Sequence, residues 1–295
     1  MNLRKELDLA IKASERGSDG GYEADGRVYP AYMTNAEWNA FLDEMSDKAK
    51  KEYGAGGGGE LIEKNGRPPK MASYGSSSRM IYRLSRDTEG FCFEKKLPTS
   101  VGGSANLDGY LEQEDRHVFV EAKCREPYHK PYDESPDRIR SVYRKLYEYI
   151  SENSYGELTC DIRSDDGRDM EVVFGRYGEV IKYLDVKQLI CHLLGIGTAL
   201  LNGSLSKKRI EMMYLVYDPT ELQLKPEAKE GISAIYETLR EECASLEMSM
   251  LFTLILTYLR DIVGIGDMSD DEIELQGYNF TFYLCDQELY PTLLV

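Results

Sequence analysis

The stretch NLDGYLEQEDRHVFVEAKC, from Asn106 to Cys124, has the pattern of two strands joined by a tight turn. If the turn is centred between Glu114 and Asp115, then Asp108 lies directly opposite Glu121 across the two strands. Opposed Cβ atoms in such a ladder are roughly 4.5–5.5 Å apart, and like charges there need a shared proton or a cation. Glu-Asp is not a preferred two-residue turn, and a loop of odd length would break the pairing. The pattern therefore predicts two facing acids, on condition of this register.

The second strand carries chemical groups on one face only. Strand alternation places Phe119, Glu121 and Lys123 on one face and the apolar side chains between them on the other. Carboxylates from neighbouring strands, together with a backbone carbonyl, are the ligands that Mg²⁺ prefers. Such an ion polarises a phosphoryl oxygen and lowers the pKa of an attacking water, which Lys123 is placed to reach. The residues therefore predict a magnesium site suited to phosphoryl chemistry.

This arrangement resembles the signature of the PD-(D/E)XK nuclease superfamily, which has the restriction-endonuclease-like fold. The signature is an aspartate in one strand and Glu-x-Lys at the end of the next, here Asp108 and the triplet Glu121–Lys123. Leu107 stands where the family name has proline. The resemblance covers roughly Glu60 to Pro219, where the chain also has a helix, three strands, a helix and a buried strand in the expected order.

The resemblance implies a role for each matched residue. Asp108 and Glu121 would hold Mg²⁺, or alternatively Mn²⁺, and the backbone carbonyl of Ala122 would assist them. Lys123 would position or activate the attacking water. All four are therefore expected at one site.

Two further positions follow from the resemblance. Many family members carry a glutamine on the helix after the lysine strand, and Gln188 fits that position. Many also carry an acid on the helix before the first strand. The helix expected from Ser76 to Arg86 contains no acid, so Glu60 and Glu63 remain as candidates, and Glu60 is preferred.

A basic segment precedes the hairpin. Residues 64–86 contain six basic side chains and no acid, in a chain of net charge −16. On the expected helix, Arg79 and Arg83 share a stripe that could face phosphates, and Ser78 offers a hydroxyl near the helix start. The alternatives are a solvated helix face and an ordinary N-cap. Arg79, Arg83 and Ser78 are therefore candidate nucleic-acid-binding residues.

The composition limits the class of protein. The 295 residues are 42% hydrophobic and 30% charged, as in a globular protein. The net charge of −16 repels nucleic acid at long range, so an anionic substrate needs a basic patch or a bridging cation. Six scattered cysteines and three histidines argue against a zinc site. The N-terminus lacks an apolar leader, and the run Met248–Leu259 is too short to span a membrane, so a cytoplasmic protein without membrane contact is expected.

The order of the expected elements indicates an α/β (α+β) fold: a restriction-endonuclease-like core in which helices flank a central mixed sheet. Residues 1–58 are expected to form an N-terminal helical extension, and residues 59–295 the main domain with an insertion at about 125–183. The run Met248–Leu259 fits a helix or a strand. Four local expectations are a helix from Thr34 to about Glu52, irregular structure for GAGGGG (Gly54–Gly59), a helix from about Pro136 to Glu152, and an exposed His117.

The leading hypothesis is a metal-dependent endonuclease that hydrolyses DNA. The alternative is a catalytically inactive module of the same fold that binds nucleic acid or protein, which the net charge favours. The sequence does not separate DNA from RNA, and it leaves room for a homodimer. It also leaves open whether the insertion forms a lid, a dimer contact or a specificity element.

Overall fold

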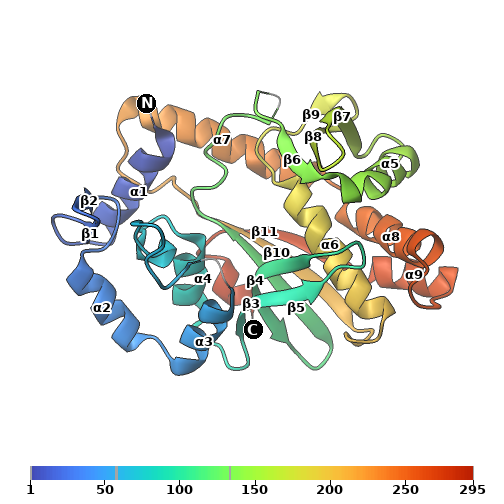
Figure 1. The fold of residues 1–295 in the computed structure, drawn as a ribbon, viewed down its shortest axis with the longest axis horizontal. Helices are drawn as coiled ribbons and strands as arrows, with labels where there is room; N and C mark the ends of the chain where they lie inside the picture. Colours follow the sequence, from blue (N-terminus) through green and yellow to red (C-terminus); the bar gives the residue numbers. More distant parts are fainter. Residues whose placement is uncertain (1, 57–58, 133, 295) are drawn as a thin grey trace.

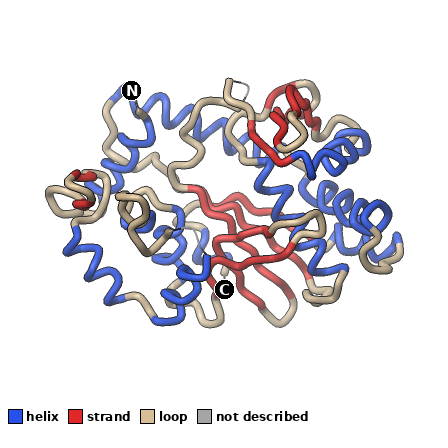
Figure 2. The backbone as a smooth tube through the Cα atoms, viewed as in Figure 1, coloured by secondary structure: helices blue, strands red, loops and turns tan. Residues whose placement is uncertain are grey.

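The computed structural model describes residues 2–56, 59–132 and 134–294. Its centre is a five-stranded mixed sheet (Figures 1 and 2). From one edge to the other the strands are β11 (Phe280–Cys285), β10 (Arg209–Val216), β5 (Arg116–Lys123), β4 (Ser104–Glu112) and β3 (Cys92–Pro98). The last three form an antiparallel meander, whereas β10 runs parallel to both of its neighbours. The expected mixed sheet is therefore confirmed.

Helices cover both faces of this sheet, because β10 is apolar on both sides. Met212 and Tyr214 face the core that contains α6 (Val186–Leu201) and α8 (Met248–Tyr258). Met213 faces the opposite core, which contains α1 (Leu3–Ser14), α3 (Asp47–Gly56) and α4 (Ser77–Ser85). Figure 1 shows α3 and α4 on one side of the sheet and α6 and α8 on the other. The run Met248–Leu259, which fitted helix or strand, is thus a buried helix.

The helix predicted from Thr34 to Glu52 is two helices. Thr34 forms the predicted capping box with Glu37 at the start of α2 (Asn35–Glu44). The chain then turns at buried Met45, and the hydroxyl of Ser46 accepts from the backbone N–H of Ala49 to begin α3. A second N-cap residue inside the expected helix therefore divides it.

The glycine run also differs from expectation. Helix α3 continues to Gly56, so the first part of GAGGGG is helical. Residues 57–58 of the run lie outside the described residues.

A second, smaller antiparallel sheet occupies part of residues 125–183. It contains β6 (Asp137–Arg140), β7 (Thr159–Asp165), β8 (Asp169–Arg176) and β9 (Glu179–Val180), with α5 (Arg144–Asn153) between the first two. Strands β7 and β8 form an antiparallel hairpin. The helix expected from Pro136 is wrong in its first half, because residues 137–140 pair with β8 and alternate between buried and exposed. Apolar side chains of β6 and β8 join the core around α6.

The expectation that His117 is exposed at the hairpin turn is wrong. His117 is 1% exposed, and its ring nitrogens bond to Tyr110 and Ser206.

Among the described residues, none of the helices has the length and apolar character needed to cross a membrane. The other elements are β1 (Tyr22–Ala24), β2 (Arg27–Tyr29), a short 3₁₀ turn (Lys70–Ala72), another (Ser141–Tyr143), α7 (Pro226–Ser245), a π-turn (Leu259–Val263), α9 (Asp270–Tyr278) and α10 (Tyr290–Leu293).

Candidate functional site

The hairpin has the predicted register. Gly109 pairs with Val120 and Glu112 with His117, and the turn between them is centred on Glu114 and Asp115. Phe119 packs in one core, while Val118 and Val120 pack in the other, as strand alternation requires. The paired stretch ends at Gly109 and Val120, one residue before the two acids.

At Asp108 the ladder is replaced by a side-chain contact. The Asp108 carboxylate accepts a hydrogen bond of 2.7 Å from the backbone N–H of Ala122. The neighbouring strand is also irregular here, because Glu94 has a left-handed backbone with φ of +55°. The predicted register is therefore confirmed as far as Gly109 and Val120, and the paired ladder stops before Asp108 and Glu121. The carboxylate of Asp108 reaches across the hairpin and bonds the main chain beside Glu121.

A pocket of about 350 Å³ opens at this end of β4 and β5. Its lining comes from segments far apart in the sequence, which the sheet, α4 and α6 bring together. It includes all of the residues predicted for catalysis and metal binding, and one predicted for phosphate contact: Glu60, Ser78, Asp108, Glu121, Ala122, Lys123 and Gln188.

A buried network fixes the two charged residues of β5. The Nζ of Lys123 lies 2.9 Å from one oxygen of Glu121, and His192 Nε2 lies 2.8 Å from the other. Burial raises the pKa of Glu121, but the Lys123 ammonium and His192 outweigh it and hold the pKa below its usual value. Burial likewise opposes the charge of Lys123, yet the Glu121 carboxylate raises the pKa of Lys123 well above its usual value. Both residues are therefore charged at neutral pH.

Helix α6 supplies the other side of this network. Asp185 is its N-cap and accepts from the backbone N–H of Gln188, and its second oxygen lies 3.5 Å from Lys123 Nζ. Gln188 Oε1 accepts from Lys123 Nζ, and His192 follows one helical turn later on the same face. The resemblance predicted Gln188 at this site, whereas the apolar sequence around His192 favours a core position for that residue. The spacing of four between them was the signal that they act on one site.

Of the two candidate acids Glu60 and Glu63, Glu60 is the one that lines the pocket. One of its oxygens accepts from Lys70 Nζ at 2.9 Å and the other from the Ser78 hydroxyl at 3.1 Å. Glu63 instead accepts from the hydroxyl of Tyr22 and does not line the pocket. Glu60 lies in the segment between α3 and α4 rather than on a helix.

Glu94 also lines the pocket, although the sequence reading passed over it as part of a strand. Burial raises its pKa to about 7, and the charges of Glu60 and Glu121 add to the effect. A carboxyl group this close to neutrality titrates in the range where enzymes work. The sequence did not indicate that Glu94 belongs to the site, because the left-handed backbone at Glu94 is not evident from residue types in an alternating strand.

We expect Glu94→Gln to change how stability depends on pH. A folded-state pKa raised from 4.5 to about 7 makes ionisation costly, so the wild type loses stability as pH rises from about 4.5 to 7. The variant should lack this loss and should be more stable by up to about 3 kcal/mol at pH 8. Urea unfolding of both proteins at pH 5 and pH 8 measures it. Equal pH dependence in the two proteins would contradict the expectation.

Arg79 and Arg83 are not at this pocket. Arg79 is 6% exposed, its guanidinium stacks over Tyr74, and both arginines pair with Glu15. They line a different pocket on the other side of α4. The expected outward stripe is therefore wrong for Arg79, because α1 supplies an acid that covers it.

The donor groups suit Mg²⁺, which takes one or two carboxylates and keeps waters or phosphate oxygens in its other positions. Asp108 and Glu121 supply oxygens, and burial together with the Glu121 charge raises the pKa of Asp108 well above its usual value. A cation there would relieve that cost. Among the described residues, no group of three or more histidine, cysteine, aspartate or glutamate side chains is arranged to hold a metal ion. Each Glu121 oxygen already accepts from Lys123 or His192, so an ion there would compete with these donors.

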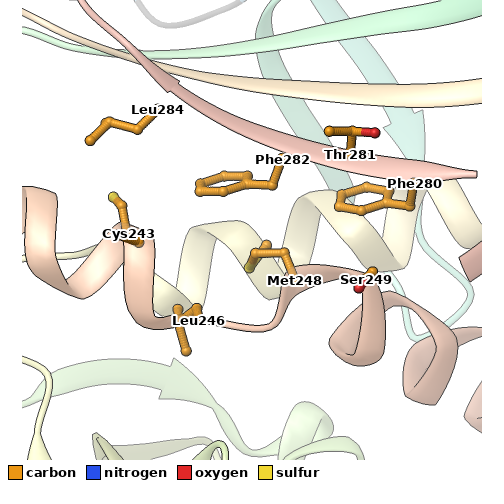
Figure 3. Close-up of a pocket in the computed structure, with 9 residues that line it drawn as sticks. Cys243, Leu246, Met248, Ser249, Phe280, Thr281, Phe282 and Leu284 are labelled. Atoms are coloured by element: carbon orange, nitrogen blue, oxygen red, sulfur yellow. The ribbon is translucent and has the colours of Figure 1, made fainter. Parts of the chain in front are cut away.

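A second pocket, of about 420 Å³, offers no such chemistry. Figure 3 shows Phe280 and Phe282 of β11 on one side of it and Met248 on the other. Its lining is apolar apart from small hydroxyl and thiol groups and includes no carboxylate or cation. The pocket at Asp108 is therefore the candidate functional site.

No protein-family model, curated protein or solved structure matches this chain.

Proposed function

We propose that the protein is a magnesium-dependent nuclease of the PD-(D/E)XK type that hydrolyses DNA phosphodiester bonds. The observation that carries the proposal is the gathering of Asp108, Glu121, Lys123 and Gln188 in one pocket from two strands and a helix. Glu60 joins them from a segment 48 residues before Asp108 in the chain. Chance placement of an Asp and a Glu-x-Lys would not bring these other two residues to the same cavity.

The topology also supports a restriction-endonuclease-like core. Along the chain come α4, the meander β3–β4–β5, then α6 and β10, and β10 lies parallel to β5. Helices α4 and α6 pack on opposite faces of the meander. The second sheet is inserted between β5 and α6, which leaves this order intact.

The residues of the pocket divide the chemistry among them. Asp108, Glu121 and the carbonyl of Ala122 would hold the ion, which supplies Lewis acidity at the phosphoryl group and lowers the pKa of a bound water. Lys123 keeps its proton and offers N–H donors to the attacking water or the phosphate. Gln188 and Asp185 orient that ammonium, and His192 orients Glu121. Glu60 and Ser78 also line the pocket and are hydrogen-bonded to each other.

We expect the wild-type protein to cleave DNA in Mg²⁺ or Mn²⁺ and to lose this activity in EDTA. The substrates should be linear, nicked and single-stranded DNA, with an RNA of the same sequence for comparison. Arg163→Ala, on the surface of the second sheet away from the pocket, is a control that should keep full activity. Activity that persists in EDTA would contradict the proposal.

A second candidate is a catalytically inactive binding module of the same fold. It is favoured by the engagement of both Glu121 oxygens by Lys123 and His192, because a metal ion would compete with these two donors. Calorimetric titration with Mg²⁺ separates the two candidates. A nuclease takes up the ion and loses it in Glu121→Gln, whereas a binding module shows no uptake in either protein.

A further inference from the structure

A third pocket, of about 350 Å³, adjoins the proposed active site. It lies between β6 and the start of α6, and Gln188 and the first turn of α6 belong to its lining. Gln188 lines both pockets and bonds to Lys123, so its side chain borders both cavities. The second space is therefore next to the residues that would contact the scissile phosphate.

The two pockets differ in charge. The active-site pocket carries more carboxylates than cations, among them Asp108, Glu121 and Glu94. The adjoining pocket is lined by Arg138, Arg140 and Lys187, with Asp185 as its one acid among the described residues. In a chain of net charge −16, this concentration of cations is unusual. It is the local positive charge that an anionic substrate requires.

The arginines are available to a ligand. Both are exposed on one face of β6, which is an edge strand of the second sheet. The side chain of Arg138 is 68% exposed, and its nearest acid, Asp166, is 4.0 Å away. Arg140 donates to the carbonyl of Gly102 and lies against the ring of Tyr143. Lys187 is paired with Asp137 at 2.7 Å, so the arginines supply most of the free charge.

We propose that this basic pocket binds the unpaired nucleotide next to the scissile phosphate, with Arg138 and Arg140 on its phosphate. The inference rests on the proposed nuclease function. Arginine forks match phosphate oxygens in pairs. The buried rings and side chains of Tyr147 and Ile139 offer an apolar floor for a base or sugar. The volume is that of a small-molecule site, which fits one nucleotide and not a base pair.

This assigns a role to the segment inserted between β5 and α6. Strand β6 and the start of α6 line this pocket together, and Lys187 of α6 pairs with Asp137 of β6. The insertion then acts as a substrate-binding wall, and the preferred substrate is single-stranded or frayed DNA.

The test measures binding of a fluorescently labelled single-stranded DNA 12-mer to the full chain. Binding is read from fluorescence anisotropy in Mg²⁺ at several NaCl concentrations. Glu121→Gln serves as the background to prevent cleavage. In that background, Arg138→Glu with Arg140→Glu should weaken binding at least tenfold. The slope of log affinity against log salt should become shallower by roughly 0.7, as expected for the loss of one neutralised phosphate on a single strand.

The matched control is Lys145→Glu with Arg168→Glu. Both residues are exposed on the same inserted segment, line neither pocket and give the same change of charge. This control should change affinity less than twofold, and Arg138→Lys with Arg140→Lys should keep the salt slope while binding more weakly than the Glu121→Gln parent. Equal effects of the two double charge reversals would overturn the proposal, and so would equal affinity for a blunt hairpin duplex.

Wild-type cleavage, measured separately, reports on the proposed function alone. If the wild type cleaves DNA but the substitutions at Arg138 and Arg140 do not change binding, only this inference is overturned. Arginine-dependent binding without cleavage supports the pocket and contradicts the nuclease.

Discussion

Asp108→Asn should abolish DNA cleavage while making the metal-free protein more stable. The loss of activity should be at least about 1,000-fold, because the substitution removes a metal oxygen from the reaction centre. Stability should rise because burial and the Glu121 charge raise the pKa of Asp108 well above its usual value. Asparagine keeps an oxygen that can accept from the Ala122 N–H without carrying a charge.

The sign of the stability change depends on pH. A folded-state pKa above the unfolded value of about 3.8 means that ionisation of Asp108 costs stability as pH rises. The advantage of the variant should therefore be absent below about pH 4 and grow above it. Each pKa unit corresponds to about 1.4 kcal/mol, and each kcal/mol to roughly 2–4 °C in melting temperature. Thermal unfolding in EDTA at pH 4 and pH 8 measures this, and a variant less stable than wild type at pH 8 would contradict it.

Lys123→Met should reduce both activity and stability. Lys123 is 5% exposed and faces the buried Glu121 carboxylate, so its removal leaves that charge with only His192. Breaking a buried pair in this way costs about 3–5 kcal/mol. Cleavage should fall by about 10²–10⁴-fold with the loss of the donor to water or phosphate. Urea unfolding and a cleavage assay measure the two effects.

A double variant tests how much of the stability loss comes from breaking the Glu121–Lys123 ion pair. Glu121→Gln with Lys123→Met removes both charges, so it should recover most of the stability lost in Lys123→Met while remaining inactive. If the double variant is less stable than Lys123→Met, the two side chains do not interact as the distances indicate.

Some of this site could be predicted from local sequence rules. The register of the β4–β5 hairpin followed from where apolar residues alternate in NLDGYLEQEDRHVFVEAKC, and the two-residue turn at Glu114 and Asp115 preserved it. The N-caps at Thr34 and Ser76 likewise follow from side chains that bond three residues ahead. Rules of this kind depend only on neighbours in the chain.

Other features depend on distant contacts and escaped prediction. Alternation predicted the register of Asp108 and Glu121, but it did not predict the left-handed backbone at Glu94, which is skipped in the pairing of β3 with β4. Arg79 looked solvent-facing until α1 brought Glu15 against it. His192 looked like core until its helix packed against β5 and set its ring beside Glu121. In each case the feature depends on a contact with another segment of the fold.

The structure also accounts for how so acidic a chain can be proposed to act on DNA. The two neighbouring pockets carry opposite charge. Carboxylates line the pocket at Asp108, and arginines line the pocket beside β6. A divalent cation would serve the first, and a phosphate would meet the second. The net charge of −16 then limits long-range attraction without preventing local binding.

The most direct test of the account is a crystal structure grown in Mn²⁺, with anomalous scattering measured at the manganese edge. We expect a manganese peak between the carboxylates of Asp108 and Glu121, with an oxygen of each within ligand distance of the ion. An empty position, with Glu121 still held by both Lys123 and His192, would contradict the metal site and the nuclease built on it.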